Sequence, residues 1–139
     1  MSFIVDASVV FAWQFPDEES ALSEKVAERL LDEGAIVPIH WVAEIANGFA
    51  MAVRRGRMSG EYRSGALDQL KSMRIEVDKD SAERLWTDTQ MLCDKHNLTA
   101  YDAAYLEMAV RLRLPLASLD KALVRAAQVE GVIVIGLSS

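Results

Sequence analysis

The sequence predicts an α/β fold, a three-layer α/β/α sandwich around a mostly parallel central sheet of about five strands. Five short apolar or β-branched runs recur along the 139 residues, and helical stretches separate each run from the next. This alternation is typical of a parallel sheet covered by helices on both faces. No linker, repeat or low-complexity segment interrupts the pattern, so we expect a single domain over residues 1–139.

The predicted strands cover residues 3–5, 35–38, 73–77, 114–118 and 132–136. The last of them, VIVIG, is continuously apolar and mostly β-branched, as expected of a strand covered on both faces. The predicted helices cover residues 20–33, 41–56, 60–72, 80–96, 100–112 and 120–130. Gly34 directly follows the first of these helices, where glycine commonly ends a helix.

Charge and composition narrow the functional classes. The net charge of −6 argues against broad electrostatic attraction to nucleic acid or to anionic lipid. A local basic strip can still guide RNA phosphates, and Arg54 and Arg55 are the first candidates, followed by Arg57, Arg111 and Arg113. The alternative for all five is a solvated helix end, where cations suit the helix dipole.

The chain also lacks the features of an exported or membrane protein. Its start, MSFIVDAS, has no basic segment, and no apolar run approaches the roughly 20 residues that span a bilayer. The single cysteine, Cys93, excludes an internal disulfide and lies in a helical pattern, so we expect it to pack. These observations favour a cytoplasmic protein.

Four acidic residues lie at predicted junctions between strands and helices. Asp6 directly follows the first strand, and Asp120 follows the fourth. Glu44 and Asp102 each lie one turn into a helix. In open parallel sheets, ligands bind beyond the carboxyl ends of the strands, so we expect these four side chains to converge at one edge.

Each acid also has a purely structural interpretation. Asp6 and Asp120 suit helix N-caps, Glu44 suits a helix flank, and Thr99 with Asp102 resembles a capping box. Taken together, however, converging carboxylates repel one another and raise some of their pKa values. A bound cation relieves that repulsion, so the set favours an ion site over four separate structural roles.

The ligand type predicts which ion binds. Carboxylate oxygens suit Mg²⁺ or Mn²⁺, whereas His40 and His96 have no metal-ligand spacing and are interpreted as surface or packing residues. Such an ion is typical of phosphoryl chemistry. Ser8 and Ser118 each lie two residues from an acid and either orient the ligands or serve turns.

These motifs resemble the PIN domain family. The matching features are the D-x-S at Asp6, the helical Glu44, the T-x-Y-D-A-x-Y of residues 99–105 and the S-x-D of residues 118–120. The length is most similar to VapC-type toxins of toxin–antitoxin pairs. The resemblance implies an Mg²⁺- or Mn²⁺-dependent endoribonuclease. Its implied acidic site is Asp6, Glu44, Asp102 and Asp120, supported by Ser8, Thr99 and Ser118. It further implies a homodimer inhibited by a cognate antitoxin.

Three alternatives stand beside this interpretation. A receiver-type signalling module could use Asp78 as its phosphoacceptor, but VIVIGLSS lacks the lysine that such a module needs. A phosphatase of the haloacid dehalogenase type would have a second acid where Ser8 stands. A catalytically silent PIN-like binding protein differs only in activity.

Overall fold

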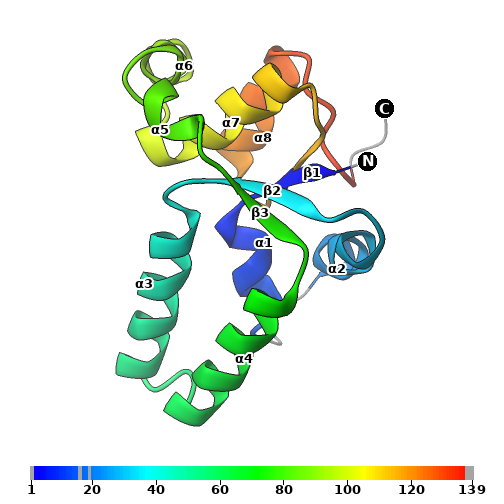
Figure 1. Ribbon diagram of the computed structural model, residues 1–139, viewed down its shortest axis with the longest axis vertical. Helices are drawn as coiled ribbons and strands as arrows, with labels where there is room; N and C mark the ends of the chain where they lie inside the picture. The colour runs from blue at the N-terminus through cyan, green and yellow to red at the C-terminus, as the bar shows by residue number, and fades with distance from the viewer. Residues whose placement is uncertain (1, 16, 19, 137–139) are drawn as a thin grey trace.

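The computed structural model describes residues 2–15, 17–18 and 20–136. Its sheet has four parallel strands in the order β3-β2-β1-β4 (Figure 1). The strands are β1 (Phe3–Val5), β2 (Ala35–Pro38), β3 (Ile75–Asp78) and β4 (Leu116–Ala117). In the central strand β1, Ile4 pairs with Ile36 on one side and with Leu116 on the other. The predicted parallel α/β sheet is confirmed.

Helices cover both faces of the sheet, as predicted. One face carries α1 (Ala7–Ala12), α2 (Ala21–Glu33), α3 (Trp41–Arg54) and α4 (Gly60–Ser72). The other carries α5 (Ser81–Arg84), α6 (Asp88–His96), α7 (Ala100–Leu112) and α8 (Lys121–Val129), which lie above the sheet in Figure 1. The chain runs from β1 to β3 in one direction and then crosses back to β4. Right-handed crossovers therefore place the two groups of helices on opposite faces.

The predicted strand over residues 132–136 is wrong in its extent. Only Val134 pairs, through one parallel bridge with Leu116, whose N–H donates to Ile133 O and whose C=O accepts from Ile135 N–H, both at 2.9 Å. Ile133 is 72% exposed, so this segment is not covered on both faces. The neighbouring strand β4 has only 2 residues, so it offers residues 132–136 too short a partner for a full strand. The sheet therefore has four strands where about five are predicted.

The structure differs from the predicted helices in two places. Helix α1 lies outside them, and its N-cap is Asp6, whose carboxylate accepts a hydrogen bond from Val9 N–H at 3.4 Å. The helix predicted over residues 80–96 is divided into α5 and α6, because Thr87 leaves the helical region at φ −126° and ψ −97°. Both pieces pack against α7, whose length is about 20 Å; a straight helix of about 25 Å would extend past it.

Helix α7 is the central helix of its face. Seven consecutive residues, Ala103 to Ala109, are buried, and the helix packs on β1, β2 and β4. Alanine side chains let this helix approach the sheet closely. Because a short turn joins the end of α7 to the start of β4, the first turn of α7 lies at the opposite edge, where β1 and β4 end. No helix within the described ranges is long and apolar enough to cross a membrane.

Gly48 lets α3 approach α1 closely. A Cβ atom at position 48 would lie 2.0 Å from Cζ of Phe11, whose ring also packs against Phe49 with centroids 6.0 Å apart. We expect Gly48→Ala to lower the free energy of unfolding by about 1–3 kcal/mol, because the Phe11 ring must move. Gly65→Ala in α4 is the matched control: its Cβ meets nothing within 4 Å, and we expect a stabilisation of about 0.5–1 kcal/mol. Equal urea midpoints for the two variants would contradict this packing.

Candidate active site

Asp6 is the buried centre of the acidic edge. It follows β1 directly, its residue surface is 2% exposed, and its backbone N–H donates to Ala117 O at 3.1 Å. Burial raises the pKa of Asp6 to about 6, against the lowering effect of hydrogen bonds from Ser118 and Ser8, and the charge of Asp102 adds to the rise. A carboxylate in this position is held at an energetic cost that a nearby cation would reduce.

Ser8 and Ser118 fix the orientation of the Asp6 carboxylate. Ser118 Oγ donates to Oδ2 of Asp6 at 2.5 Å and accepts the Asp120 N–H at 3.0 Å. Ser8 Oγ donates to Oδ1 of Asp6 and accepts the Leu119 N–H at 3.0 Å. The two hydroxyls therefore connect the end of β1 to the segment that follows β4. This is the orienting geometry that the spacing of the two serines suggests.

The Asp102 carboxylate interacts electrostatically with the other three acids. Burial raises its pKa first, and the charges of Asp120 and Glu44 raise it further. The hydroxyl of Thr99 has the opposite effect, and it also accepts the Asp102 N–H at 3.2 Å as the N-cap of α7. The structural interpretation of Thr99 is thus correct, but it leaves the Asp102 carboxylate facing like charges.

Asp120 combines a structural role with a free oxygen. Its Oδ1 accepts the Leu123 N–H at 2.9 Å, which makes it the N-cap of α8. In the described part of the chain, its second oxygen has no hydrogen-bond partner. The structure therefore couples Asp6 to Asp102, and Asp102 to both Asp120 and Glu44, at the carboxyl edge of the sheet.

Glu44 is held by two residues that are not among the predicted site residues. Tyr105 Oη donates to Oε1 of Glu44 at 2.5 Å, and His40 Nε2 lies 3.3 Å from the same oxygen. Burial alone would raise the pKa of Glu44, but these contacts lower it overall. His40 is thus more than the surface or packing residue that its spacing indicates.

The four carboxylates suit a hydrated ion better than an enclosed one. Among residues 2–15, 17–18 and 20–136, no three carboxylate, imidazole or thiol side chains are grouped closely enough to hold a metal ion. Mg²⁺ keeps several waters and usually binds through one or two carboxylates together with substrate phosphates. An all-oxygen donor set whose members repel one another fits Mg²⁺ or Mn²⁺ in that manner.

The PIN domain family matches residues 3–129, a span that contains all four acids. The chain belongs to the PIN domain family. It is similar to Ribonuclease VapC3 from Pyrobaculum aerophilum, with 28% identity over 123 residues that make up 88% of this chain and 92% of the relative. The predicted family resemblance is confirmed.

Solved structures share the PIN fold. The crystal structure of PAE2754 from Pyrobaculum aerophilum has a TM-score of 0.69 at 24% identity, covering 97% of this chain and 84% of that one. FitAcB from Neisseria gonorrhoeae has a TM-score of 0.65 at 19% identity, covering 95% of each chain. FitAB bound to an IR36 DNA fragment has a TM-score of 0.60 at 17% identity, covering 99% and 98%. At these identities the likeness establishes the fold.

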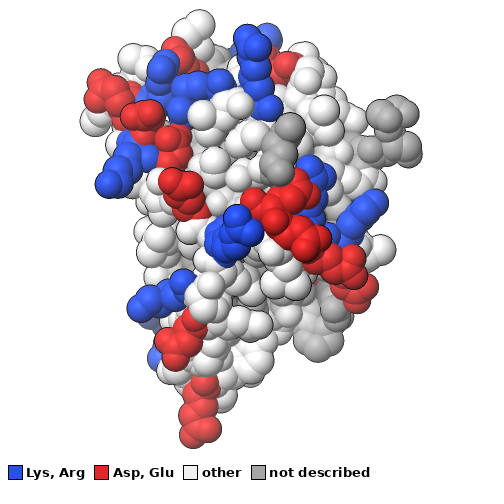
Figure 2. Space-filling model, turned by 45° about the vertical axis from the view of Figure 1, so that its right-hand side comes forward, with Lys and Arg blue, Asp and Glu red and all other residues white. Residues whose placement is uncertain are grey.

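Among the described residues, Arg54 and Arg55 are exposed at the end of α3 and have no acidic partner. In the described part of the PIN domain, Arg54 and Arg55 make no ion pair, whereas Arg57 bonds Asp17 and Glu18 at 3.4 and 2.9 Å. The face in Figure 2 shows basic and acidic side chains interspersed, without a continuous basic surface. On this face, any electrostatic guidance of a phosphate backbone would be local.

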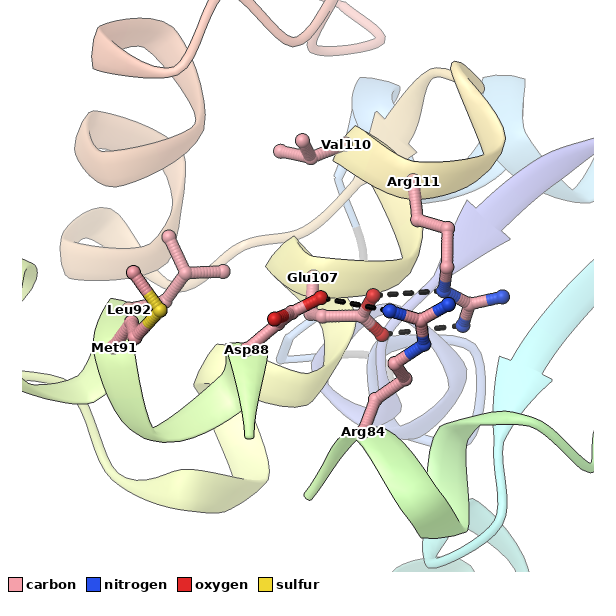
Figure 3. Close-up of a pocket in the computed structure, with 7 residues that line it drawn as sticks. All are labelled: Arg84, Asp88, Met91, Leu92, Glu107, Val110 and Arg111. Atoms are coloured by element: carbon pink, nitrogen blue, oxygen red, sulfur yellow. Dashed lines mark hydrogen bonds and ion pairs between the residues drawn. The ribbon is translucent and has the colours of Figure 1, made fainter. Parts of the chain in front are cut away.

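Arg111 belongs to a structural ion-pair network instead of a basic strip. It lines a pocket of about 400 Å³ between α5, α6 and α7, where it bonds Glu107 at 2.7 and 3.1 Å (Figure 3). The same guanidinium bonds Asp78 at the end of β3. Asp78 is thereby paired with a structural arginine, which disfavours it as the phosphoacceptor of a receiver module. Arg113 is exposed in the left-handed conformation that ends α7.

Proposed function

We propose that this PIN domain is a metal-dependent endoribonuclease and the toxin of a toxin–antitoxin pair. One observation carries the proposal: a buried Asp6 carboxylate, oriented by two serine hydroxyls, is electrostatically coupled to Asp102, and Asp102 is coupled to Asp120 and Glu44. Four acids arranged in this way are costly unless a cation binds. The similarity to Ribonuclease VapC3 supports RNA as the substrate.

The residues have distinct tasks in hydrolysis. Bound Mg²⁺ or Mn²⁺ would polarise the scissile phosphate and acidify a water molecule. Asp6, Asp102 and Asp120 would hold the ion directly or through its bound waters, and Ser8 and Ser118 would keep the Asp6 carboxylate in place. Glu44 would orient the ion or the attacking water. Hydrolysis forms a bond between the water oxygen and phosphorus and breaks the bond to the leaving ribose oxygen, which takes up a proton.

The RNA backbone would approach along α3. Arg54 lies ten positions after Glu44, so about 15 Å of helix lies between the acidic edge and the exposed arginines. Arg54 and Arg55 would therefore contact phosphates away from the cleaved bond and contribute to binding more than to chemistry.

The same acidic edge would also bind the protein partner. We propose that a cognate antitoxin covers it with a peptide segment that places a basic side chain beside Asp102 and Asp120. Such a cation would relieve the same repulsion that the metal relieves, and would exclude the metal by doing so. We further propose that the protein acts in the cytoplasm as a homodimer.

Cleavage of a mixed pool of structured RNA tests the proposed function. The protein would be purified free of any bound partner and assayed with Mg²⁺, with Mn²⁺ and with excess EDTA. We expect cutting with either ion and none with EDTA. A folded, partner-free protein that cuts no RNA with either ion would instead favour the silent binding protein.

The variant Asp102→Asn separates catalysis from folding. We expect it to abolish metal-dependent cleavage and to leave the metal-free fold as stable as wild type or more stable, because it removes a carboxylate that faces Asp120 and Glu44. Thermal unfolding in EDTA and cleavage rates measure the two effects. If the variant unfolds easily but its folded fraction cleaves normally, Asp102 is a structural residue only.

A further inference from the structure

The contacts of Glu44 are arranged asymmetrically. Tyr105 Oη, at 2.5 Å, and His40 Nε2, at 3.3 Å, both approach Oε1 of the carboxylate. Within the described residues, no protein group bonds Oε2. The Glu44 side chain is 30% exposed, so solvent and ligands can reach it. One oxygen is thus occupied by protein donors, and the other is available.

The two donors also pack against each other. Tyr105 is 1% exposed, and its ring meets the His40 ring edge-on with centroids 5.4 Å apart. His40 Nε2 also lies 3.1 Å from Tyr101 O. Since both neighbours of Nε2 are acceptors, the proton of the neutral ring belongs on Nε2. His40 at the start of α3 is therefore clamped against the first turns of α7, on either side of Asp102.

We propose that Tyr105 and His40 are positioning residues that hold Glu44 by Oε1 and so direct Oε2 toward the cation and its water at the acidic edge. This inference rests on the proposed function for the identity of the site. Groups that orient a metal-binding carboxylate typically change metal affinity or activity 10–100-fold when they are removed. The Tyr105 hydroxyl, with the shorter contact, is expected to contribute more than His40.

Calorimetric titration of the full-length, RNA-free protein with Mn²⁺ tests the proposal. The variants are Tyr105→Phe, Glu44→Gln and the double variant, and Tyr62→Phe is the matched control because its hydroxyl bonds Gln14 at 2.9 Å on the protein surface. We expect Tyr105→Phe to weaken Mn²⁺ binding by about 10–100-fold. The Tyr62→Phe variant should bind as wild type. His40→Ala, expected to weaken binding less, carries the same test if Tyr105→Phe folds poorly.

The double variant separates positioning from a general structural effect. If Tyr105 acts through Glu44, removing its hydroxyl from Glu44→Gln should change the Mn²⁺ dissociation constant by less than about twofold, because the coupled pair is already broken. The same loss in both backgrounds, or wild-type binding by Tyr105→Phe, would overturn the inference while leaving the ribonuclease proposal intact. If the variants show this coupling between Tyr105 and Glu44 in Mn²⁺ binding but the wild type cleaves no RNA, only the proposed function is overturned. A wild-type protein that binds no Mn²⁺ overturns both.

Discussion

Replacing Asp6 by asparagine is expected to lower RNA cleavage by more than about 100-fold, since even groups that only orient a metal ligand contribute 10–100-fold. The same change is expected to stabilise the metal-free protein above pH 6. Asp6 is 2% exposed, and burial raises its pKa from 3.8 to about 6. A single residue thus has opposite effects on activity and on stability.

The sign of the stability effect follows from the two pKa values. Well below pH 4, Asp6 is neutral in both the folded and the unfolded protein. Between pH 4 and pH 6 the unfolded chain ionises first, so the stability of wild type falls as the pH rises. Above pH 6 the full penalty of about 3 kcal/mol is present. Asparagine removes this penalty but leaves one serine hydroxyl without its acceptor, at about 1 kcal/mol.

We therefore expect Asp6→Asn to be about 1–2 kcal/mol more stable than wild type at pH 7.5 in EDTA. The advantage should vanish near pH 4. Urea unfolding across this pH range measures the difference between the two proteins. An asparagine variant that is less stable at pH 7.5 would show that the ionised carboxylate is a net stabilising helix cap.

Arg111→Ala is expected to cause the largest loss of stability, about 3 kcal/mol or more. Its guanidinium bonds Glu107, whose side chain is 3% exposed, and Asp78, whose side chain is 12% exposed. Without Arg111, Glu107 and Asp78 lose their shared cation partner, which is far more costly than losing a surface pair. The second change Glu107→Gln should recover part of the loss, because it removes the buried charge.

Arg84→Ala is the matched control from the same pocket (Figure 3). Arg84 bonds Asp88 at 2.9 Å, but the two side chains are 42% and 50% exposed. Such an exposed pair one helical turn apart contributes at most about 0.5 kcal/mol. Chemical denaturation of both alanine variants measures the contrast. Similar losses of unfolding free energy in the two variants would mean that burial does not determine how much these ion pairs stabilise the protein.

Three of the four proposed site acids, Asp6, Asp102 and Asp120, carry a local signal in the sequence. Asp6 and Asp120 interrupt apolar strands at the point where a helix begins, and Thr99 marks the start of α7. The orientation of Glu44 could not be predicted in the same way, because Tyr105 lies 61 residues away in the chain. A retrospective signal exists for His40, which lies four residues before Glu44 on the same helical face.

The errors in the fold have a similar cause. The segment VIVIG has strand-like composition, but the number of pairs it forms depends on its partner β4, which has only 2 residues. Helix α1 has only 6 residues and two valines, and it packs against Gly48 of α3 from a distant part of the chain. Composition predicts that an element can form, whereas its length depends on tertiary contacts.

Whether Asp6, Asp102 and Asp120 act as one cation site is tested most directly by the Mn²⁺ dissociation constant of wild type and of Asp6→Asn, Asp102→Asn and Asp120→Asn. Asp68→Asn, an exposed change on α4, is the control. We expect each of the three site variants to bind Mn²⁺ at least about 10-fold more weakly than wild type, and the control to bind equally well. Wild-type affinity in all three site variants would show that these acids do not form a shared metal site.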